Sequence, residues 1–359
     1  MKTLSAIARE MGVSSATVSY VYHNKWREKR IRPDLAEKIQ RKLERERGRP
    51  DMLGEQLRSG QTRTAGVLLP DLDQIYYLRL LAGLERRLGQ ENYMLFLGNS
   101  HRSHNCRQTE LLDRMLMRRV DMLILSPVPL PDLDAELDRI AALDTPIVFV
   151  DNYIKGRDIP YAVSDNRWGA RQAVARALAE GRRRLLFIGG NPGMAALADR
   201  LEGCRDALGE AGLELRDDWI LWKQDLGEGL HEALRSRLGS SDRPDAIFCD
   251  SLFKCDEIIA VLAESNLRHP DDVLLCGFDY PAPGSETALH QKAIHGPLLV
   301  VRQDTETMGK AAAELAIRAG AIGPGESERL IRPLLTWEFD EGEEEGAPSL
   351  FAKQKRRAS

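Results

Sequence analysis

The chain has 359 residues, enough for two or three domains, and its 43% apolar and 30% charged residues are typical of a soluble globular protein. No run of about 18 apolar residues is present that would cross a membrane. The net charge of −4 is uneven: residues 1–64 hold 15 Lys and Arg against 8 Asp and Glu, which is +7, so the remainder is −11. A basic segment on an acidic body indicates an anionic partner for that segment, although a solvated basic face is the alternative.

The first residues predict two short helices around a tight turn. Apolar side chains recur at helical spacing from Leu4 to Met11, with Thr3 able to cap the helix and Gly12 able to end it. Ser14 can cap a second helix, on which Val18 faces inward. The outer face of that helix and the turn after it then present Ser15, Ala16, Thr17, Ser19, Tyr20, His23, Asn24 and Lys25.

Two such helices, with a third expected after Pro33, form a helix-turn-helix whose second helix enters the major groove of DNA. Small side chains let that helix lie close to the bases. Hydroxyl groups donate or accept at base edges, and Ala16 or the Thr17 methyl suits a thymine methyl group. Lys and Arg around this face suit phosphates. The alternative is a small helical bundle with an incidental polar face.

The stretch LSAIAREMGVSSATVSYV resembles the N-terminal domain of the lactose-repressor (LacI/GalR) family of transcription regulators. The resemblance implies operator DNA as a partner, contacted by Thr3, Ser14 and the outer face just described. His23 stands where the family usually has Asn, and the turn HNKWREKRIRPDLAEKI is longer and more basic than in most members. In that turn, and in SYV, the chain is similar to the fructose-repressor (catabolite repressor-activator) and sucrose-repressor branch.

Gly, Pro and Arg mark residues 48–64 as a linker with a short helix over roughly 51–58. The resemblance implies that this hinge helix folds on operator DNA and inserts Leu57 into the minor groove, with Arg58 beside phosphates. Gly54 replaces a common Ala and weakens the helix by about 1 kcal/mol. The alternative is a flexible linker in which Leu57 packs on the body.

From Thr64 on, short apolar runs such as AGVLLPD, VDMLILSP and RLLFIGG alternate with helical sequence, which predicts parallel sheets. Ligands of such sheets bind beyond the carboxyl ends of the strands. Each polar residue there suits a loop cap, but together they provide the acceptors that sugar hydroxyls need. These strand-end residues are Asp71, Asn99, Ser126, Asp151, Asn152, Asp250, Ser251 and Asp279.

The segments VSDNRWGARQAVARALAEGRRRLLFIGG and VVRQDTETMGKAAAELAI extend the resemblance to about residue 339. It implies an α/β fold like that of periplasmic sugar-binding proteins, with two subdomains, three chain crossings and a cleft. We therefore expect a DNA-binding domain, a hinge, a body and a tail of low complexity that is disordered. Their ranges are 1–47, 48–64, 65–339 (N-subdomain 65–164 and 295–327, C-subdomain 165–294 and 328–339) and 340–359.

The resemblance also places an effector site in the cleft. The usual effector Arg of the family is Ala198 here, whereas Arg200 is kept as in the fructose-repressor branch, and a guanidinium there suits a phosphate. A sugar phosphate is the preferred effector, while the many carboxylates favour a neutral sugar. Arg200 as an ion pair and Trp168 as core packing are the alternatives. The expected effector-binding residues are Asp71, Tyr76, Tyr77, Asp151, Trp168, Arg200, Asp250 and Asp279.

The predicted function is a ligand-controlled transcriptional repressor, a homodimer or tetramer because such helices read half-sites in pairs. A transport-type sugar-binding protein would need a signal peptide, but MKTLSAIARE reaches Arg9 and Glu10 before any apolar core, so a cytoplasmic location is expected. The five Cys form no C-x-x-C pair, and no G-x-G-x-x-G, P-loop or nucleophile elbow follows a strand. We therefore expect no metal, no cofactor and no enzymatic activity.

Overall fold

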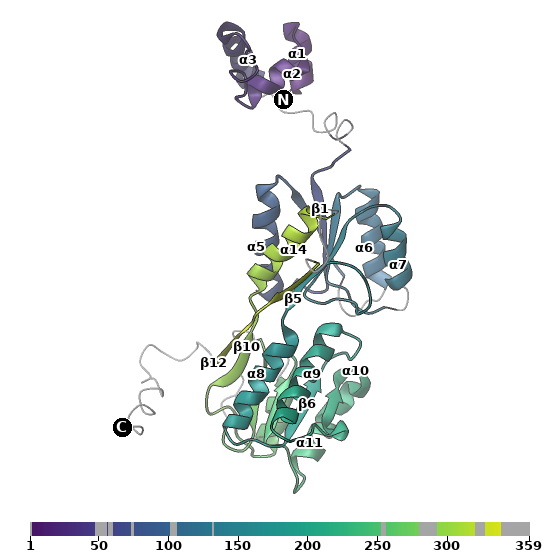
Figure 1. Ribbon diagram of the computed structural model, residues 1–359, viewed down its shortest axis with the longest axis vertical. Coiled ribbons are helices and arrows are strands. Elements are labelled where there is room, and N and C mark those ends of the chain that lie inside the picture. Colours follow the sequence, from purple (N-terminus) through teal and green to yellow (C-terminus); the bar gives the residue numbers. More distant parts are fainter. Residues whose placement is uncertain are drawn as a thin grey trace, which may run out of the picture. The chain divides into compact units, whose positions relative to one another are not determined.

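The computed structural model describes residues 2–46, 56, 60–72, 75–100, 106–130, 133–252, 256–279, 293–319 and 327–338. It divides into two compact units, Met1–Thr64 and Ala65–Ser359 (Figure 1). The hinge helix expected over 51–58, including Leu57 and Arg58, and the tail 340–359 lie outside the described residues, apart from Gln56. Among the described helices, none is long and apolar enough to span a membrane.

The first unit is the predicted set of three helices. The Thr3 hydroxyl caps the first helix by accepting from the Ala6 amide at 3.2 Å, and Gly12 ends it with a left-handed φ of 64°. Because Ile7, Val18 and Ile39 are fully buried, one on each helix, the three helices share a single small core. The helices are α1 (Leu4–Met11), α2 (Ser15–Tyr22) and α3 (Pro33–Glu46).

The second unit contains two six-stranded sheets, with the orders β11-β5-β4-β3-β1-β2 and β12-β10-β9-β8-β6-β7. The central strands pair in parallel, and β12 pairs antiparallel with β10. The predicted α/β class with parallel sheets is therefore confirmed. The strands of the first sheet are β1 (Thr64–Leu69), β2 (Met94–Asn99), β3 (Met122–Leu125), β4 (Ile147–Val150), β5 (Tyr161–Ser164) and β11 (Glu328–Ile331), and those of the second are β6 (Leu185–Gly189), β7 (Ile220–Trp222), β8 (Ala246–Cys249), β9 (Leu274–Phe278), β10 (Leu298–Arg302) and β12 (Leu334–Glu338).

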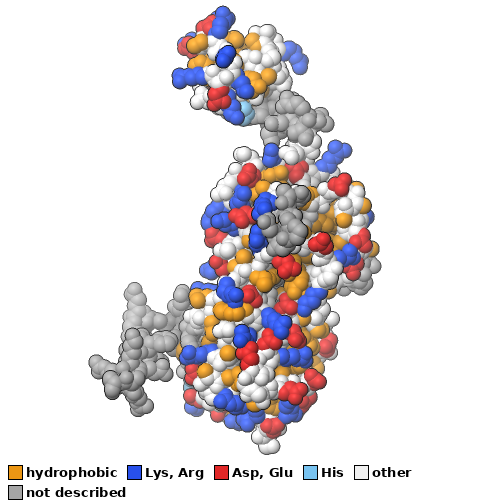
Figure 2. All heavy atoms as spheres, viewed as in Figure 1, with side chains coloured by type: hydrophobic (Ala, Val, Ile, Leu, Met, Phe, Trp, Pro, Cys, Tyr) orange, Lys and Arg blue, Asp and Glu red, His pale blue; other side chains and the backbone are white. Residues whose placement is uncertain are grey.

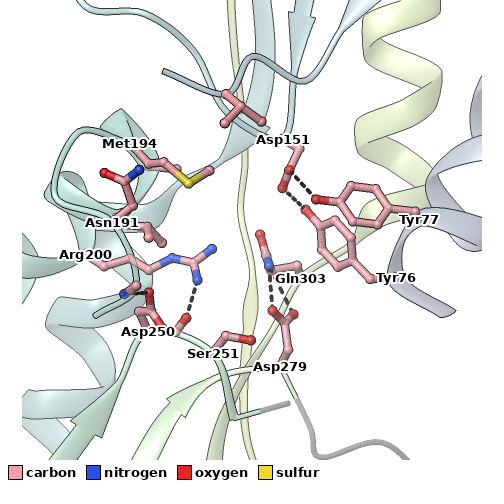
Figure 3. Close-up of a pocket in the computed structure, with 14 residues that line it drawn as sticks. Tyr76, Tyr77, Asp151, Asn191, Met194, Arg200, Asp250, Ser251, Asp279 and Gln303 are labelled. Carbon is pink, nitrogen blue, oxygen red and sulfur yellow. Dashed lines mark hydrogen bonds between the residues drawn. The ribbon is translucent and has the colours of Figure 1, made fainter. Parts of the chain in front are cut away.

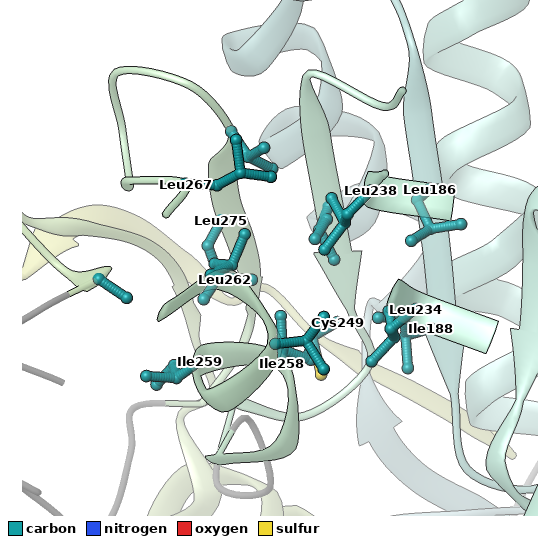
Figure 4. Close-up of a cluster of buried hydrophobic side chains, with 14 of the residues drawn as sticks. Leu186, Ile188, Leu234, Leu238, Cys249, Ile258, Ile259, Leu262, Leu267 and Leu275 are labelled. Carbon is teal, nitrogen blue, oxygen red and sulfur yellow. The ribbon is translucent and has the colours of Figure 1, made fainter. Parts of the chain in front are cut away.

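Helices cover both sheets, as Figure 1 shows. Buried aliphatic side chains from helices and strands fill the layers, and Figure 4 shows one such cluster on the second sheet. The helices beside the first sheet are α5 (Ile75–Gln90), α6 (Cys106–Met117), α7 (Leu133–Ala141) and α14 (Thr305–Ile317), and those beside the second are α8 (Asn166–Ala179), α9 (Ala195–Glu210), α10 (Lys223–Leu226), α11 (Leu230–Leu238) and α12 (Asp256–Glu264).

Two glycines let α5 and α14 approach each other closely. A Cβ atom added to Gly309 would lie 2.1 Å from the Leu80 carbonyl oxygen, and one added to Gly83 would lie 2.1 Å from the Glu306 carbonyl oxygen. No other residue fits at either position without moving backbone. This packing fixes α14 to the first sheet, although its sequence follows a strand of the second.

The chain crosses between the two sheets three times: from β5 to α8, from β10 to α14, and from β11 to β12. This differs from the expected boundaries at 295–327 and 328–339. β10 lies in the second sheet, between β9 and β12, whereas β11 pairs in parallel with β5 in the first. Among the described strands, β10 therefore belongs with the C-subdomain and β11 with the N-subdomain. An apolar run shows that a strand exists but not which sheet it joins.

Candidate functional site

The outer face of α2 carries small polar side chains. Ser14 caps the helix, because its hydroxyl accepts from the Thr17 amide at 3.0 Å and lies 2.8 Å from the Thr17 hydroxyl. Ser15 and Ala16, in the first turn, are exposed, whereas Val18 faces the core. The side chains expected to read bases therefore lie on the open side of a rigidly capped helix.

The turn after α2 is basic and ordered. Asn24 has a left-handed φ of 56°, and the Ile31 amide donates to the Trp26 carbonyl at 2.9 Å. The ammonium of Lys29 lies 5.4 Å from the centre of the Tyr20 ring, a cation–π contact. Sequence patterns do not predict this contact, which holds the half-buried Tyr20 beside the face that is expected to contact DNA. Figure 2 shows Lys and Arg side chains on the visible surface of this unit, and its exposed cations in the turn are Lys25, Arg27, Lys29, Arg30 and Arg32.

A cleft of about 280 Å³ lies in the second unit between the two subdomains (Figure 3). Its walls come from the carboxyl ends of strands, from the loops after them and from the first turns of α5 and α9, as expected for parallel sheets. Fourteen residues line it: Tyr76, Tyr77, Val128, Asp151, Gly190, Asn191, Met194, Ala196, Leu197, Arg200, Asp250, Ser251, Asp279 and Gln303.

Asp151, just after β4, receives three hydrogen bonds. Tyr76 donates at 2.6 Å to one carboxylate oxygen, and Tyr77 and Ser126 each donate at 3.0 Å to the other. Burial and the nearby carboxylates raise the pKa of Tyr76 well above its ordinary value, so that its hydroxyl remains a donor. The two tyrosines meet edge to face at 4.9 Å. The two tyrosines therefore fix the orientation of the Asp151 carboxylate.

Asp279, just after β9, is held by the chain crossing between β10 and α14. The Gln303 side-chain amide lies 3.0 and 3.1 Å from its two oxygens. Burial, followed by repulsion from Asp151 and Asp250, raises the pKa of Asp279 to about 6, although Arg200 and Gln303 oppose the shift. The cleft thus contains a carboxylate that is costly to keep charged.

Arg200, on α9, is almost fully buried and already has partners. Its Nε donates at 2.8 Å to the Asn166 side-chain oxygen, and an Nη donates to the Asp250 carbonyl. The guanidinium also lies over the Phe278 ring at 3.7 Å. The Asp250 carboxylate in turn accepts from the Gly190 amide at 2.7 Å. Figure 3 shows Arg200 and the Asp151 group approaching the cleft from opposite sides.

Two residues expected at the cleft lie elsewhere. Asp71 follows β1 but does not line the cavity. Trp168, in the first turn of α8, packs against Arg332 at 4.4 Å, and Arg332 also pairs with Asp165 at 3.3 Å. Trp168 thus lies where the chain crosses between the subdomains and does not line the cavity, an arrangement that fits the packing alternative. Conversely, sequence reasoning missed Gln303, although it lies in the late segment that carries the family resemblance.

The described residues contain no group of three or more His, Cys, Asp or Glu arranged to hold a metal ion. Cys204, Cys249 and Cys276 are buried thiols that form no disulfide among the described residues. Burial raises the pKa of Cys276 to about 12, so this thiol stays protonated and unreactive.

Comparison with known proteins places this geometry in context. A family model described as periplasmic binding proteins and sugar binding domain of LacI family matches residues 62–320. The Catabolite control protein A of Priestia megaterium is 27% identical over 278 residues, 77% of this chain and 82% of that protein. The Ribose operon repressor of Haemophilus influenzae is 26% identical over 311 residues, 84% and 90% of the two chains. A solved LacI family transcriptional regulator from Mycobacterium smegmatis, 22% identical, shares the fold with a TM-score of 0.63, over 77% of this chain and 98% of its own.

Proposed function

We propose a function for this chain, which belongs to the family of periplasmic binding proteins and LacI-type sugar-binding domains. It is a DNA-binding transcriptional repressor. A small, neutral, polyhydroxylated ligand in the cleft sets its affinity for operator DNA. The observation that carries the proposal is one chain with both a capped, outward-facing α2 and a polar cleft between two subdomains. A transport-type sugar-binding protein would not need the outward-facing helix α2. The proposed molecule is a regulator rather than an enzyme and acts as a homodimer, because helices of this kind read paired half-sites.

The charge of the cleft supports a neutral ligand over a sugar phosphate. Three carboxylates line it, those of Asp151, Asp250 and Asp279, against the single cation of Arg200. A phosphate would face these carboxylates, and the guanidinium that would bind it is already engaged by Asn166 and the Asp250 carbonyl. Sugar hydroxyls, in contrast, donate well to carboxylates. The sequence resemblance to the fructose-repressor branch suggested a phosphate, and the cleft favours the other choice.

Control of DNA binding would follow from a shift between two arrangements of the subdomains. A ligand that contacts both walls binds one arrangement better and raises its population. Because β1 begins at Thr64, where the expected hinge 48–64 ends, a movement of the N-subdomain would alter the separation of the paired hinges in a dimer. DNA affinity would then change by the coupling free energy, and DNA would change ligand affinity by the same factor.

Two measurements test the function. In a gel-shift or footprinting assay with the DNA upstream of its own gene, we expect a protected, sequence-specific site whose occupancy changes with ligand. No specific site under any condition would remove the proposal of operator binding. Calorimetric titration with fructose, sucrose, fructose 1-phosphate and fructose 1,6-bisphosphate then tests the ligand class. We expect a neutral sugar to bind and the phosphates to fail, whereas tight binding of a phosphate would contradict the charge argument.

A further inference from the structure

The helix α9 lacks a cap of its own. The first amides of an α-helix have no partner within the helix, and a side chain at the N-cap position ordinarily accepts from one of them. The N-cap residue of α9 is Met194, which makes no such hydrogen bond. The Ala196 amide, in the buried first turn, therefore needs an acceptor from outside the helix.

That acceptor comes from the other subdomain. The Asn152 side-chain oxygen, in the loop after β4 of the N-subdomain, accepts from the Ala196 amide of the C-subdomain at 3.1 Å. Asn152 is fully buried, and its side-chain nitrogen donates at 2.8 Å to the Pro127 carbonyl of its own subdomain. The amide group is thus fixed on the N-subdomain, and only its oxygen crosses the cleft.

One turn further along α9, a carboxylate completes the contact. Asp199 accepts from the Tyr153 hydroxyl at 2.7 Å through one oxygen, and its other oxygen lies 3.0 Å from the Lys155 ammonium. Tyr153 is held in place by stacking on Tyr161 at 4.5 Å. Burial and the bond to Asp199 raise the pKa of the Tyr153 hydroxyl, which keeps it a donor. Three consecutive or nearly consecutive residues of one loop therefore contact two turns of one helix.

The two contacting segments also build the cleft. Asp151, next to Asn152, lines the cavity, and so do Ala196, Leu197 and Arg200 on either side of Asp199. We propose that Asn152, Tyr153 and Lys155 form a latch with α9, in which the N-subdomain caps that helix across the cleft and Asp199 holds the cleft closed in readiness for ligand. The latch residues are not among those that line the cavity, so their role is to position the residues that are. The functional part of this inference rests on the proposed function.

Asp199 sets the population of the closed cleft in this scheme. The apparent affinity for a ligand is reduced by the fraction of molecules that are closed, so opening the latch weakens binding without removing any ligand contact. A matched control lies on the same helix. Asp206 forms a two-point pair with Arg167 at 2.5 and 2.8 Å, and both residues belong to the C-subdomain. Asp206→Asn therefore removes an ion pair comparable to that of Asp199, but one that lies within a single subdomain.

The test compares Asp199→Asn and Asp206→Asn with the parent chain at full length, by hydrogen–deuterium exchange without ligand or DNA. We expect Asp199→Asn to raise exchange over 195–199 about three- to tenfold, because it removes the ion pair with Lys155 and weakens the hydrogen bond from Tyr153. Asp206→Asn should leave exchange there unchanged. Unchanged exchange in Asp199→Asn, or an equal rise in both variants, would overturn the latch. Tyr153→Phe should reproduce the rise in part, because it removes the hydrogen bond to Asp199. It should add less to Asp199→Asn than to the parent chain, because the neutral Asn oxygen accepts that bond more weakly than the carboxylate.

Titration with whichever of fructose or sucrose binds the parent chain gives the functional result. We expect Asp199→Asn to weaken binding by a factor similar to the rise in exchange, and Asp206→Asn to leave binding unchanged. Equal affinities in the parent and Asp199→Asn, with raised exchange, would refute a role in ligand binding. If neither sugar binds the parent chain, the proposed ligand class fails, while the exchange measurement still decides the latch.

Discussion

The Gln303 side chain donates to both carboxylate oxygens of Asp279, at 3.0 and 3.1 Å. Asp279 directly follows β9 of the C-subdomain, and Gln303 lies at the crossing into α14 of the N-subdomain. A carboxylate that lines the cleft is therefore hydrogen-bonded to one of the chain crossings between the subdomains.

The raised pKa of Asp279 predicts an effect on stability. Its pKa of about 6 in the folded chain exceeds the ordinary Asp value of about 3.9, so folding favours the protonated form. Its stabilising contribution is complete below about pH 4 and is lost as the pH rises through 6. We expect Asp279→Asn to be more stable than the parent chain by about 1 kcal/mol at pH 7.5, since the side chain is partly exposed, with no gain at pH 4.

Denaturant unfolding at several pH values measures that difference, with the highly exposed Asp217→Asn as control. If the difference in the free energy of unfolding between Asp279→Asn and the parent chain were constant from pH 4 to 8, the pKa of Asp279 would not be raised. The same variant should bind ligand less tightly, because the amide accepts fewer hydrogen bonds than the carboxylate. A variant that is more stable but binds ligand less tightly would show that Asp279 serves binding and lowers the stability of the fold.

His269 predicts the opposite dependence on pH. Burial lowers its pKa to about 4, and its neutral ring accepts from the Leu275 amide at 2.9 Å while Nε2 lies 3.0 Å from the Pro297 carbonyl. Because the folded value lies below the ordinary value of about 6.5, stability is full above pH 6.5 and falls by about 3 kcal/mol as the pH drops to 4. Denaturant unfolding of His269→Gln should show a lower but flatter stability profile over this window than the parent chain.

The turn and reading face of the first unit predict two different DNA-binding defects. Tyr20 lies beside the reading face, so Tyr20→Ala should relax the operator sequence selected from a random pool. Lys25 is exposed beside the helix, so Lys25→Ala should weaken binding to all sequences and reduce the slope of log affinity against log salt by about 1. An unchanged selected sequence for Tyr20→Ala would show that another residue reads the bases.

The contact between α5 and α14 predicts a large loss of stability from one methyl group. In Gly309→Ala the new Cβ would overlap the Leu80 carbonyl oxygen at 2.1 Å, so two helices must separate. We expect a loss of about 3 kcal/mol in the free energy of unfolding, measured with denaturant. Gly209→Ala is the matched control, because no atom lies within 4 Å of its added Cβ on α9. That variant should gain up to about 1 kcal/mol from helix propensity alone.

The sequence predicted the helices of the first unit because caps and apolar spacing are local. Ser14 and Gly12 act within four residues of where they stand. It also predicted that strand-end carboxylates would meet, since the ends of parallel strands share an edge, and Asp151, Asp250 and Asp279 do line one cleft. This part of the site follows from topology.

The remaining features depend on contacts between distant segments. Trp168 packs against Arg332, 164 positions later in the chain, and no local pattern reveals that partner. Gln303 reaches the cleft only because β10 belongs to the second sheet and α14 to the first. Asn152 resembles a loop residue, and its role depends on a missing cap in α9. Such contacts can be identified only from the tertiary structure, because the residues that form them are far apart in the sequence.

The late strands have a consequence for how the chain is made. β11 closes one edge of the first sheet at Glu328–Ile331, and β12 closes one edge of the second at Leu334–Glu338. Neither subdomain can complete its sheet during synthesis until these two late strands have left the ribosome. Until then β5 and β10 expose unpaired edges, which are sites for association with other nascent chains. A premature stop shortly before residue 328 would therefore leave two incomplete subdomains rather than one intact and one missing.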